Sequence, residues 1–346
     1  MGKTVGTRIL ERSIIKHIEK SPVTGVGVGK DFSILSDGCT VVAEGFSDAE
    51  YDVTCFLGNS NSDETAAGHS SLSIGEVALI RALNNLVCSG VRYSTKYPEN
   101  NEIDMSINID AGVDCPEQKL RDEMAYLVVA AEKRGIRIIG GNTVYRTDGD
   151  SYAVSITVYG KITEEDKARY AEKARQGDLI FYVGSIGHFG ASMAAAKNPE
   201  RLQERLPLSY IEGAIMDPAG LEIGELAREL IDTGAYYIHD ITFGGAYRAF
   251  FETAYRFDKG ITVIHEQLPI RQDTIEICEV LGLNPYEITG TGGFIGLCHM
   301  DQQDDIWDKL QALGVNADFV SGLTVYKEKV VLSNSNHMKR SLTYYE

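Results

Sequence analysis

The chain of 346 residues is long enough for one large or two medium domains, each with its own core. Its 33 basic and 50 acidic residues give a net charge of −17, which repels phosphate backbones, so we expect no nucleic-acid partner. No segment has the apolar length of a membrane span and the N-terminus does not resemble a signal peptide, so we expect a cytoplasmic protein without a membrane partner. The six scattered cysteines include no Cys-x-x-Cys pair, which argues against a zinc ribbon or a disulfide framework.

The first half of the chain is predicted to mix strands and helices. Apolar and alternating runs predict strands at 41–46, 103–110, 136–139 and 153–158. Helical spacing of Leu120, Met124, Leu127, Val128 and Ala131 predicts an amphipathic helix over 116–134 that packs one face on a sheet. The polar segment 59–71 is predicted to be a loop.

A very polar helix is predicted at 163–176, ending at Gly177 and Asp178. We place the domain boundary at its start, which gives an N-terminal domain of residues 1–162 and a C-terminal domain of residues 163–346.

The second half repeats the mixture. It contains predicted strands at 179–183 and 261–264, helices at 191–196, 246–255 and 274–281, and helices marked by Ile223, Leu226 and Leu230 and by Ile306, Leu310 and Leu313. The alternation is irregular and several strands lie close together in sequence. This favours an α+β (α/β) arrangement, with helices covering sheets, over a uniformly wound parallel sheet.

The most informative stretch is 237–246, where an apolar run ends on Asp240 and Thr242 and is followed by Gly244, Gly245 and a helix. Glycines let the backbone come close to a ligand, and the N–H groups at a helix start favour an anion. An acidic residue beside an anion site needs a cation between them or a substrate group to hold. The same pattern also fits a capped turn that binds nothing, and both interpretations stay open.

Three further glycine-rich segments occur, and two of them directly follow predicted strands. Gly140, Gly141, Asn142 and Thr143 follow the strand at 136–139; the segment Ser185-Ile186-Gly187-His188-Phe189-Gly190 follows the strand at 179–183 and opens a helix; Thr289-Gly290-Thr291-Gly292-Gly293 lies near the far end. In this order and at these separations, the segments resemble the aminoimidazole ribonucleotide synthetase (PurM-like) superfamily. Its members include selenophosphate synthetase, thiamine monophosphate kinase and the nitrile-forming hydrogenase maturation protein.

The first half matches this superfamily with several exchanges. Residues 29–35 resemble its Gly-Asp-Asp-Ala-Ala-Val-Ile segment, with Asp31 as the second aspartate and Lys30 in place of the first. Glu44 is the nearest acidic candidate on a strand that ends in aspartate in the family. Asn85 and Asn142 stand where the Asn-Asp-Leu and Gly-Gly-Asp-Thr motifs have aspartates.

The second half is most similar to the hydrogenase maturation branch. Residues 185–190 resemble its Thr-Ile-Gly-Asp-His-Gly, 239–245 its Arg-Asp-Pro-Thr-Arg-Gly-Gly with Glu252 downstream, and 276–285 its Ala-Cys-Glu-Leu-Leu-Gly-Leu-Asp-Pro. Thr291-Gly292-Gly293 has some likeness to selenophosphate synthetase. The reactive cysteines of both branches have no counterpart, since none follows Cys298 or lies in the glycine-rich segment 25–29, so a free small-molecule substrate fits better.

The resemblance implies a homodimer in which ATP binds at the subunit interface, with magnesium on carboxylates, and phosphorylates an amide-type or carbonyl-type oxygen. It implies Asp31, Glu44 and Asp240 as metal ligands and Asp240 and His239 as catalytic residues. The implied nucleotide-binding residues are Asp31, Asn85, Gly140, Gly141, Asn142, Thr143, Gly187, His188, Gly190, Thr242, Gly244 and Gly245.

The two asparagines put magnesium in doubt, because they remove two negative charges from beside the phosphates. Three interpretations follow: an enzyme that still uses ATP, a nucleotide- or metabolite-binding maturation protein without turnover, and a site rebuilt for chemistry without ATP. A structural dimer that binds no ligand is a fourth. Single residues have plainer interpretations too: His188 and His239 as structural hydrogen-bonding groups, and Cys88 as a core residue.

Overall fold

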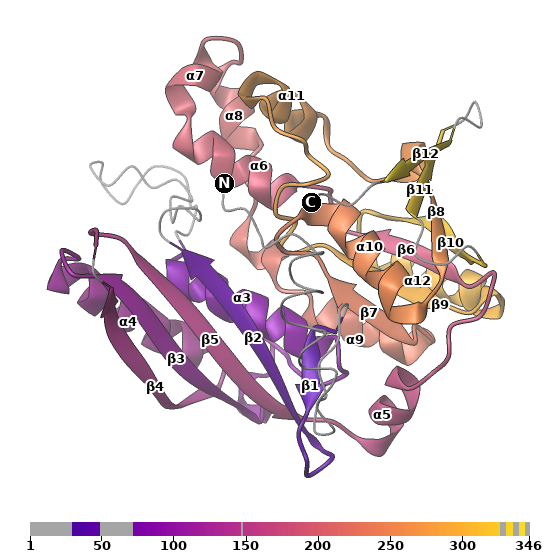
Figure 1. The fold of residues 1–346 in the computed structure, drawn as a ribbon, viewed down its shortest axis with the longest axis horizontal. Coiled ribbons are helices and arrows are strands. Elements are labelled where there is room, and N and C mark those ends of the chain that lie inside the picture. The colour runs from indigo at the N-terminus through magenta and orange to yellow at the C-terminus, as the bar shows by residue number, and fades with distance from the viewer. Residues whose placement is uncertain (1–29, 49–71, 147, 326–329, 335–338, 343–346) are drawn as a thin grey trace.

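A computed structural model describes residues 30–48, 72–146, 148–325, 330–334 and 339–342. The predicted loop at 59–71 and the glycine-rich segment 25–29 lie outside these residues. Two mixed sheets with helices packed on them form the molecule, which confirms the predicted fold class (Figure 1). The strands of the first sheet lie within residues 32–161 and those of the second within 179–342.

The first sheet has the order β1-β2-β5-β3-β4. Its strands are β1 (Phe32–Ile34), β2 (Thr40–Asp48), β3 (Ile103–Gly112), β4 (Ile136–Arg146) and β5 (Tyr152–Lys161). Neighbours are antiparallel except β3 and β4, which are parallel. Alternate residues of β3 and β5 are buried, as their period-two pattern predicts.

The sequence predicts a strand at 136–139 that ends before the glycine-rich segment at 140–143, but this prediction is wrong, because 140–143 continue β4 and form no turn. Backbone pairing with β3 runs through Gly140, Gly141 and Asn142, with an irregularity after Met105. A Cβ at Gly141 would lie 1.8 Å from the Ile107 carbonyl oxygen, so this glycine serves close strand pairing.

Two helices pack against the first sheet. Helix α3 (Ile74–Val87) begins at Ser73, whose hydroxyl accepts a hydrogen bond from the Glu76 N–H. It approaches β2 so closely that a Cβ at Gly45 would lie 2.1 Å from the Ala78 carbonyl oxygen. Helix α4 (Glu117–Lys133) confirms the prediction at 116–134, although Val128 is 37% exposed.

The second sheet has the order β12-β11-β8-β10-β6-β9-β7. Its strands are β6 (Leu179–Val183), β7 (Tyr237–Asp240), β8 (Gly260–Ile264), β9 (Phe294–Cys298), β10 (Ala317–Thr324), β11 (Val330–Ser333) and β12 (Lys339–Leu342). Strand β7 at one edge is buried along its whole length, because helices of both halves cover it.

The helix predicted at 163–176 is shorter than expected. It is α5 (Glu164–Tyr170), which begins at the Thr163 cap, and the following residues form an irregular connection to β6. The Asp178 carboxylate accepts a hydrogen bond from the Arg175 N–H, so the side chain, and not a helical carbonyl, satisfies this backbone group.

The remaining helices belong to the second half. They are α6 (His188–Lys197), α7 (Pro199–Gln203), α8 (Leu208–Gly213), α9 (Gly224–Thr233), α10 (Gly245–Phe257), α11 (Gln272–Leu281) and α12 (Gln303–Leu313). Short 3-10 turns lie at Pro98–Asn100 in the first half and at Pro218–Leu221, His265–Gln267 and Met300–Gln302 in the second. Helix α11 ends at Leu281, as the helix predicted at 274–281 does, and Gly282 follows it in the left-handed conformation. Among the described helices, none is long and apolar enough to span a bilayer.

Helix α3 lies between the two halves of the molecule (Figure 1). It is buried almost throughout, and its residues share one core with α9 and with β6, β7 and β9. Polar side chains of α3 reach across: Asn84 donates to the Leu221 carbonyl oxygen at 2.8 Å and accepts from the Ile223 N–H at 3.1 Å. The two halves therefore share buried polar contacts as well as apolar ones.

Candidate active site

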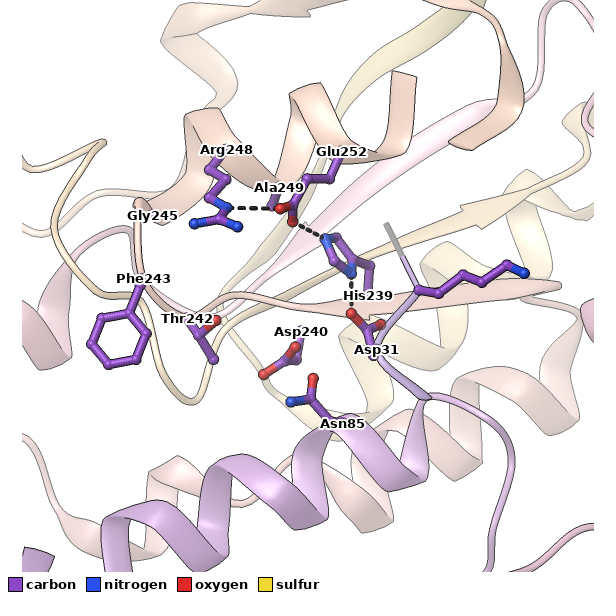
Figure 2. Close-up of a pocket in the computed structure, with 11 residues that line it drawn as sticks. Asp31, Asn85, His239, Asp240, Thr242, Phe243, Gly245, Arg248, Ala249 and Glu252 are labelled. Carbon is purple, nitrogen blue, oxygen red and sulfur yellow. Dashed lines mark hydrogen bonds and ion pairs between the residues drawn. The ribbon is translucent and has the colours of Figure 1, made fainter. Parts of the chain in front are cut away.

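A cavity of about 390 Å³ lies where the start of β1, helix α3 and the β7–α10 turn meet (Figure 2). Asp31 comes from the residues before β1, Asn85 from α3, and His239 and Asp240 from the end of β7. Its lining residues are Lys30, Asp31, Asn85, His239, Asp240, Thr242, Phe243, Gly245, Arg248, Ala249 and Glu252. Segments far apart in the sequence thus meet in one polar cavity.

The imidazole of His239 is held between two carboxylates (Figure 2). Its Nδ1 lies 2.5 Å from Oδ1 of Asp31 and its Nε2 lies 3.1 Å from Oε2 of Glu252. Carboxylate oxygens accept hydrogen bonds, so both ring nitrogens donate and the ring is an imidazolium. Burial opposes this charge, but Asp31 and Glu252 outweigh it and hold the pKa of His239 well above 6.5.

The network extends to a second cation. Arg248 Nε donates to Oε1 of Glu252 at 2.7 Å, one helical turn away on α10. Although burial opposes ionisation of Glu252, the hydrogen bond from His239 and the charge of Arg248 keep the pKa of that carboxyl below its ordinary value. Asp31, His239, Glu252 and Arg248 therefore form an alternating row of charges along one wall.

Asp240 lies near the cations His239 and Arg81, but these do not outweigh its burial and the charge of Asp31. Its side chain is buried, and its Oδ2 has no hydrogen-bond partner in the described part of the chain. Burial and the charge of Asp31 raise the pKa of Asp240 well above its usual range. Ligand atoms of Asp31, His239 and Asp240 lie within 4.8 Å of one another. A divalent cation bound by the two carboxylates would compensate both charges, so these residues fit a metal ion.

The structure brings together six of the predicted site residues: Asp31, Asn85, His239, Asp240, Thr242 and Gly245 all line the cavity. Asn85 donates its side-chain N–H to the Glu44 carbonyl oxygen at 2.9 Å. Its amide lies next to Asp240 (Figure 2).

Glu44 itself is exposed on β2. It is not part of the group of possible metal-binding side chains, which consists of Asp31, His239 and Asp240. Its role as a metal ligand stays a prediction.

The residues at 140–143 lie elsewhere. They belong to the exposed strand β4, where Asn142 lines a separate cavity of about 190 Å³ on the first sheet, with Asp48, Asp110 and Arg146. Within this chain they do not meet the Asp31–Asp240 cavity.

The two glycine turns of the second half pack on the chain's own backbone. Gly187 and Gly245 have φ values of 61° and 65°, and a Cβ would lie 2.3 Å from the Pro285 oxygen in the first case and 2.5 Å from the Tyr286 oxygen in the second. The Gly190 N–H likewise donates to the Thr289 oxygen at 3.0 Å. Segment 285–293 thus lies against both turns, and these glycines have a structural function.

His188 also has a structural partner. Its Nε2 lies 3.0 Å from the Ala214 carbonyl oxygen, and burial lowers the pKa of its ring. It lies outside the residues that line the cavity.

Cys88 is fully buried at the end of α3, which confirms its interpretation as a core residue, and burial raises the pKa of its thiol well above the ordinary range.

Sequence reasoning left Arg248 and Arg81 out of the site. Arg248 and Glu252 are four residues apart on α10, so helical spacing alone predicts that their side chains lie on the same face of the helix. Arg81 is buried and its Nε donates to Thr291 at 3.2 Å, while its guanidinium carbon lies 4.3 Å from the centre of the Phe243 ring. Nothing local in the sequence indicates that contact.

No family model matches the chain. Among curated proteins it is 27% identical over 225 residues to the carbamoyl dehydratase HypE of Rhodobacter capsulatus, a match that covers 64% of this chain and 61% of that protein. It is 22% identical over 340 residues to a putative hydrogenase expression/formation protein of Methanocaldococcus jannaschii, covering 96% and 91% of the two chains. The chain spans about three fifths of the length of the first two curated relatives it matches.

Solved structures with the same fold cover nearly the whole chain. A HypE–HypF complex gives a TM-score of 0.70 at 15% identity, covering 97% of this chain and 99% of the other. HypE in complex with ATP gives a TM-score of 0.64 at 17% identity, covering 100% and 96%.

The likeness to these solved structures shows that the chain has the PurM-like fold, built here from two mixed sheets covered by helices. Its sequence is similar to hydrogenase maturation proteins of the HypE type.

Proposed function

We propose that this protein uses ATP to phosphorylate and so activate an amide-type or carbonyl-type oxygen of a small molecule. The observation that carries the proposal is the buried Asp31–Asp240 pair, in which Oδ2 of Asp240 has no hydrogen-bond partner among the described residues. The names of the relatives support it, since carbamoyl dehydratases act on a carbamoyl group and one HypE structure holds ATP.

Asp31 and Asp240 are the carboxylates that would hold Mg²⁺. A bound magnesium ion would neutralise phosphate charge and orient the nucleotide. His239 donates from both nitrogens, so it acts as a positioning residue that fixes the Asp31 carboxylate.

The remaining cavity residues offer contacts to the reacting groups. Lys30 and Arg248 supply positive charge on the cavity wall. Asn85 and Thr242 supply neutral hydrogen-bonding groups beside Asp240. In the transfer, the acceptor oxygen bonds to the γ-phosphorus of ATP, the bond from that phosphorus to the bridging oxygen breaks, and ADP leaves with the electron pair.

Calorimetric titration with ATP, with and without magnesium, followed by an ADP-release assay, tests this proposal. We expect binding that depends on magnesium and is lost in Asp240→Asn, while the exposed Asp304→Asn on α12 binds as the wild type does. Absence of ATP binding to the wild-type protein would refute the proposal.

A second candidate function is a maturation protein that binds nucleotide without turnover. It is favoured by Asn85, which places an amide beside Asp240, and by the HypE–HypF complex, which shows a relative assembled with a partner protein. ATP binding without magnesium and without ADP release would favour this candidate.

We further propose a cytoplasmic homodimer with domains at 1–162 and 163–346, associated through the first sheet. Strand β4 exposes Ile139 and Tyr145 by 52% and 62%, and α4 exposes Tyr126 by 61%. A second copy packed on β4 would cover these side chains and would close over the cavity that Asn142 lines. The predicted nucleotide contacts at 140–143 would then face the partner.

A further inference from the structure

A second cavity, of about 250 Å³, lies next to the candidate active site. Helices α6 and α7, the end of α11, residues 287–289 and the β7–α10 turn form its walls. Phe243 lines both cavities, and Gly244 and Gly245 continue the shared wall. The two cavities are therefore neighbours, separated by the turn that follows Asp240.

Apolar side chains form one part of the wall of this second cavity. Met193 and Ala194 of α6 are 7% and 8% exposed, and Ile288 is 4% exposed. Leu281 and Leu283 are half-buried beside them. Apolar walls with a few polar groups at the opening are characteristic of sites for small molecules.

The opening carries charge of the opposite sign to the chain as a whole. Lys197 and Arg201 are exposed at its edge, and one half-buried carboxylate, that of Glu287, also lines the cavity. Arg201 donates to the Val280 carbonyl oxygen at 3.0 Å, which holds its guanidinium against α11. In a chain of net charge −17, two cations at a cavity opening favour an anionic ligand group.

The buried side chain of Arg81 packs against the wall between the two cavities. The Arg81 guanidinium lies 4.3 Å from the centre of the Phe243 ring and 3.4 Å, by its Nη2, from the Thr289 hydroxyl. Thr289 lines the second cavity, and Arg81 is 1% exposed. Buried contacts therefore hold the Phe243 ring in place in the wall that the two cavities share.

From this geometry we propose that the second cavity binds the phosphoryl acceptor, and that the acceptor is a small carboxylic acid with an apolar body and an amide. Its carboxylate lies at Lys197 and Arg201, its apolar body lies against Met193 and Ile288, and its amide extends past Phe243. The role as acceptor rests on the proposed function, whereas the binding itself does not.

N-carbamoyl-L-leucine is a suitable probe, because it combines a carboxylate, an apolar side chain and a carbamoyl amide. Its affinity is measured by ligand-observed NMR titration, beside its neutral analogue N-carbamoyl-L-leucinamide. We expect saturable binding to the wild-type protein and about tenfold weaker binding of the neutral analogue. The Lys197→Ala/Arg201→Ala variant should weaken binding of the acid about tenfold as well.

Two further variants complete the test. Ala194→Trp, which fills the cavity, should abolish binding, and the charge-matched control Arg121→Ala/Lys133→Ala on α4 should bind as the wild type does. If Ala194→Trp fails to fold, the Lys197→Ala/Arg201→Ala variant still tests the proposal, because both of its substitutions are at exposed positions. Equal affinity of acid and amide, equal affinity in the double variant, or no saturation of the wild-type protein would overturn the proposal.

Titration of ATP into the same preparations separates the two proposals. Probe binding without ATP binding would remove the proposed function and leave the cavity assignment standing. ATP binding without probe binding would do the reverse.

Discussion

Nδ1 of His239 lies 2.5 Å from Oδ1 of Asp31, although 208 positions separate the two residues in the sequence. This contact joins the residues before β1 to the end of β7, on opposite halves of the molecule. It also places a positive charge where Asp31 and Glu252 would otherwise repel each other.

The stability of the ligand-free protein should depend on pH through His239. Its pKa is raised in the folded state, so the stabilisation is fully present below pH 6.5 and is lost as pH rises through the folded pKa. Urea unfolding midpoints between about pH 6 and pH 9 should fall in the wild type and change less in His239→Gln. Parallel pH profiles of the two proteins would contradict the imidazolium assignment.

Metal-linked stabilisation should separate the candidate ligands. Magnesium or manganese at about a hundred times its dissociation constant should raise the free energy of unfolding of the wild type by about 2.7 kcal/mol. Asp31→Asn and Asp240→Asn should lose this response, and Glu44→Gln should keep it, because Glu44 is exposed and is not part of the group of possible metal-binding side chains. Thermal denaturation with and without metal measures it, and a lost response in Glu44→Gln would reinstate Glu44 as a ligand.

Without metal, Asp240→Asn should stabilise the protein by about 1–2 kcal/mol near neutral pH, because burial and the charge of Asp31 oppose the ionisation of Asp240 in the folded state but not in the unfolded chain. Chemical denaturation in the presence of a chelator measures the difference. A less stable variant would mean that the Asp240 carboxylate has a compensating partner.

Arg81→Met should destabilise the protein by about 2–4 kcal/mol, because it leaves the Thr291 hydroxyl and the Phe46 carbonyl oxygen without their buried donor. The matched surface change Arg121→Met should stay within about 0.5 kcal/mol. Urea denaturation compares the two, and equal effects would show that the contacts of Arg81 contribute little.

Two glycines with similar backbone angles should differ in their tolerance of alanine. Gly282, at φ 70°, has open space where a Cβ would lie, so Gly282→Ala should cost about 1 kcal/mol from backbone strain alone. Gly245, at φ 65°, would add a Cβ 2.5 Å from the Tyr286 oxygen, so Gly245→Ala should cost about 3 kcal/mol or more. Equal melting temperatures for the two variants would show that segment 285–293 moves aside easily.

Much of the fold follows from local patterns. The alternation of apolar and polar residues predicts β3 and β5, because each strand has one buried face. Helix α11 ends before Gly282, because a glycine readily adopts the left-handed conformation at a helix end. The strand predicted at 136–139 is too short, because glycine and asparagine usually mark the end of a strand, whereas here residues 140–143 continue the edge strand β4.

The site was only partly predictable for a related reason. Asp240 and Thr242 could be found from the pattern of an apolar run followed by glycines. The pairing of His239 with Asp31, and the position of Arg81 behind Phe243, depend on contacts between distant segments, which residue spacing does not encode.

Helix α3 belongs to the first half by sequence, yet its Arg81 and Asn84 side chains form hydrogen bonds with residues of the second half. A chimera that joins the first half of this protein to the second half of a relative would bury a guanidinium and an amide against unmatched partners. The two halves should therefore evolve together. A chimera should fold well only when helix α3 and the second-half residues that form hydrogen bonds with it come from the same protein.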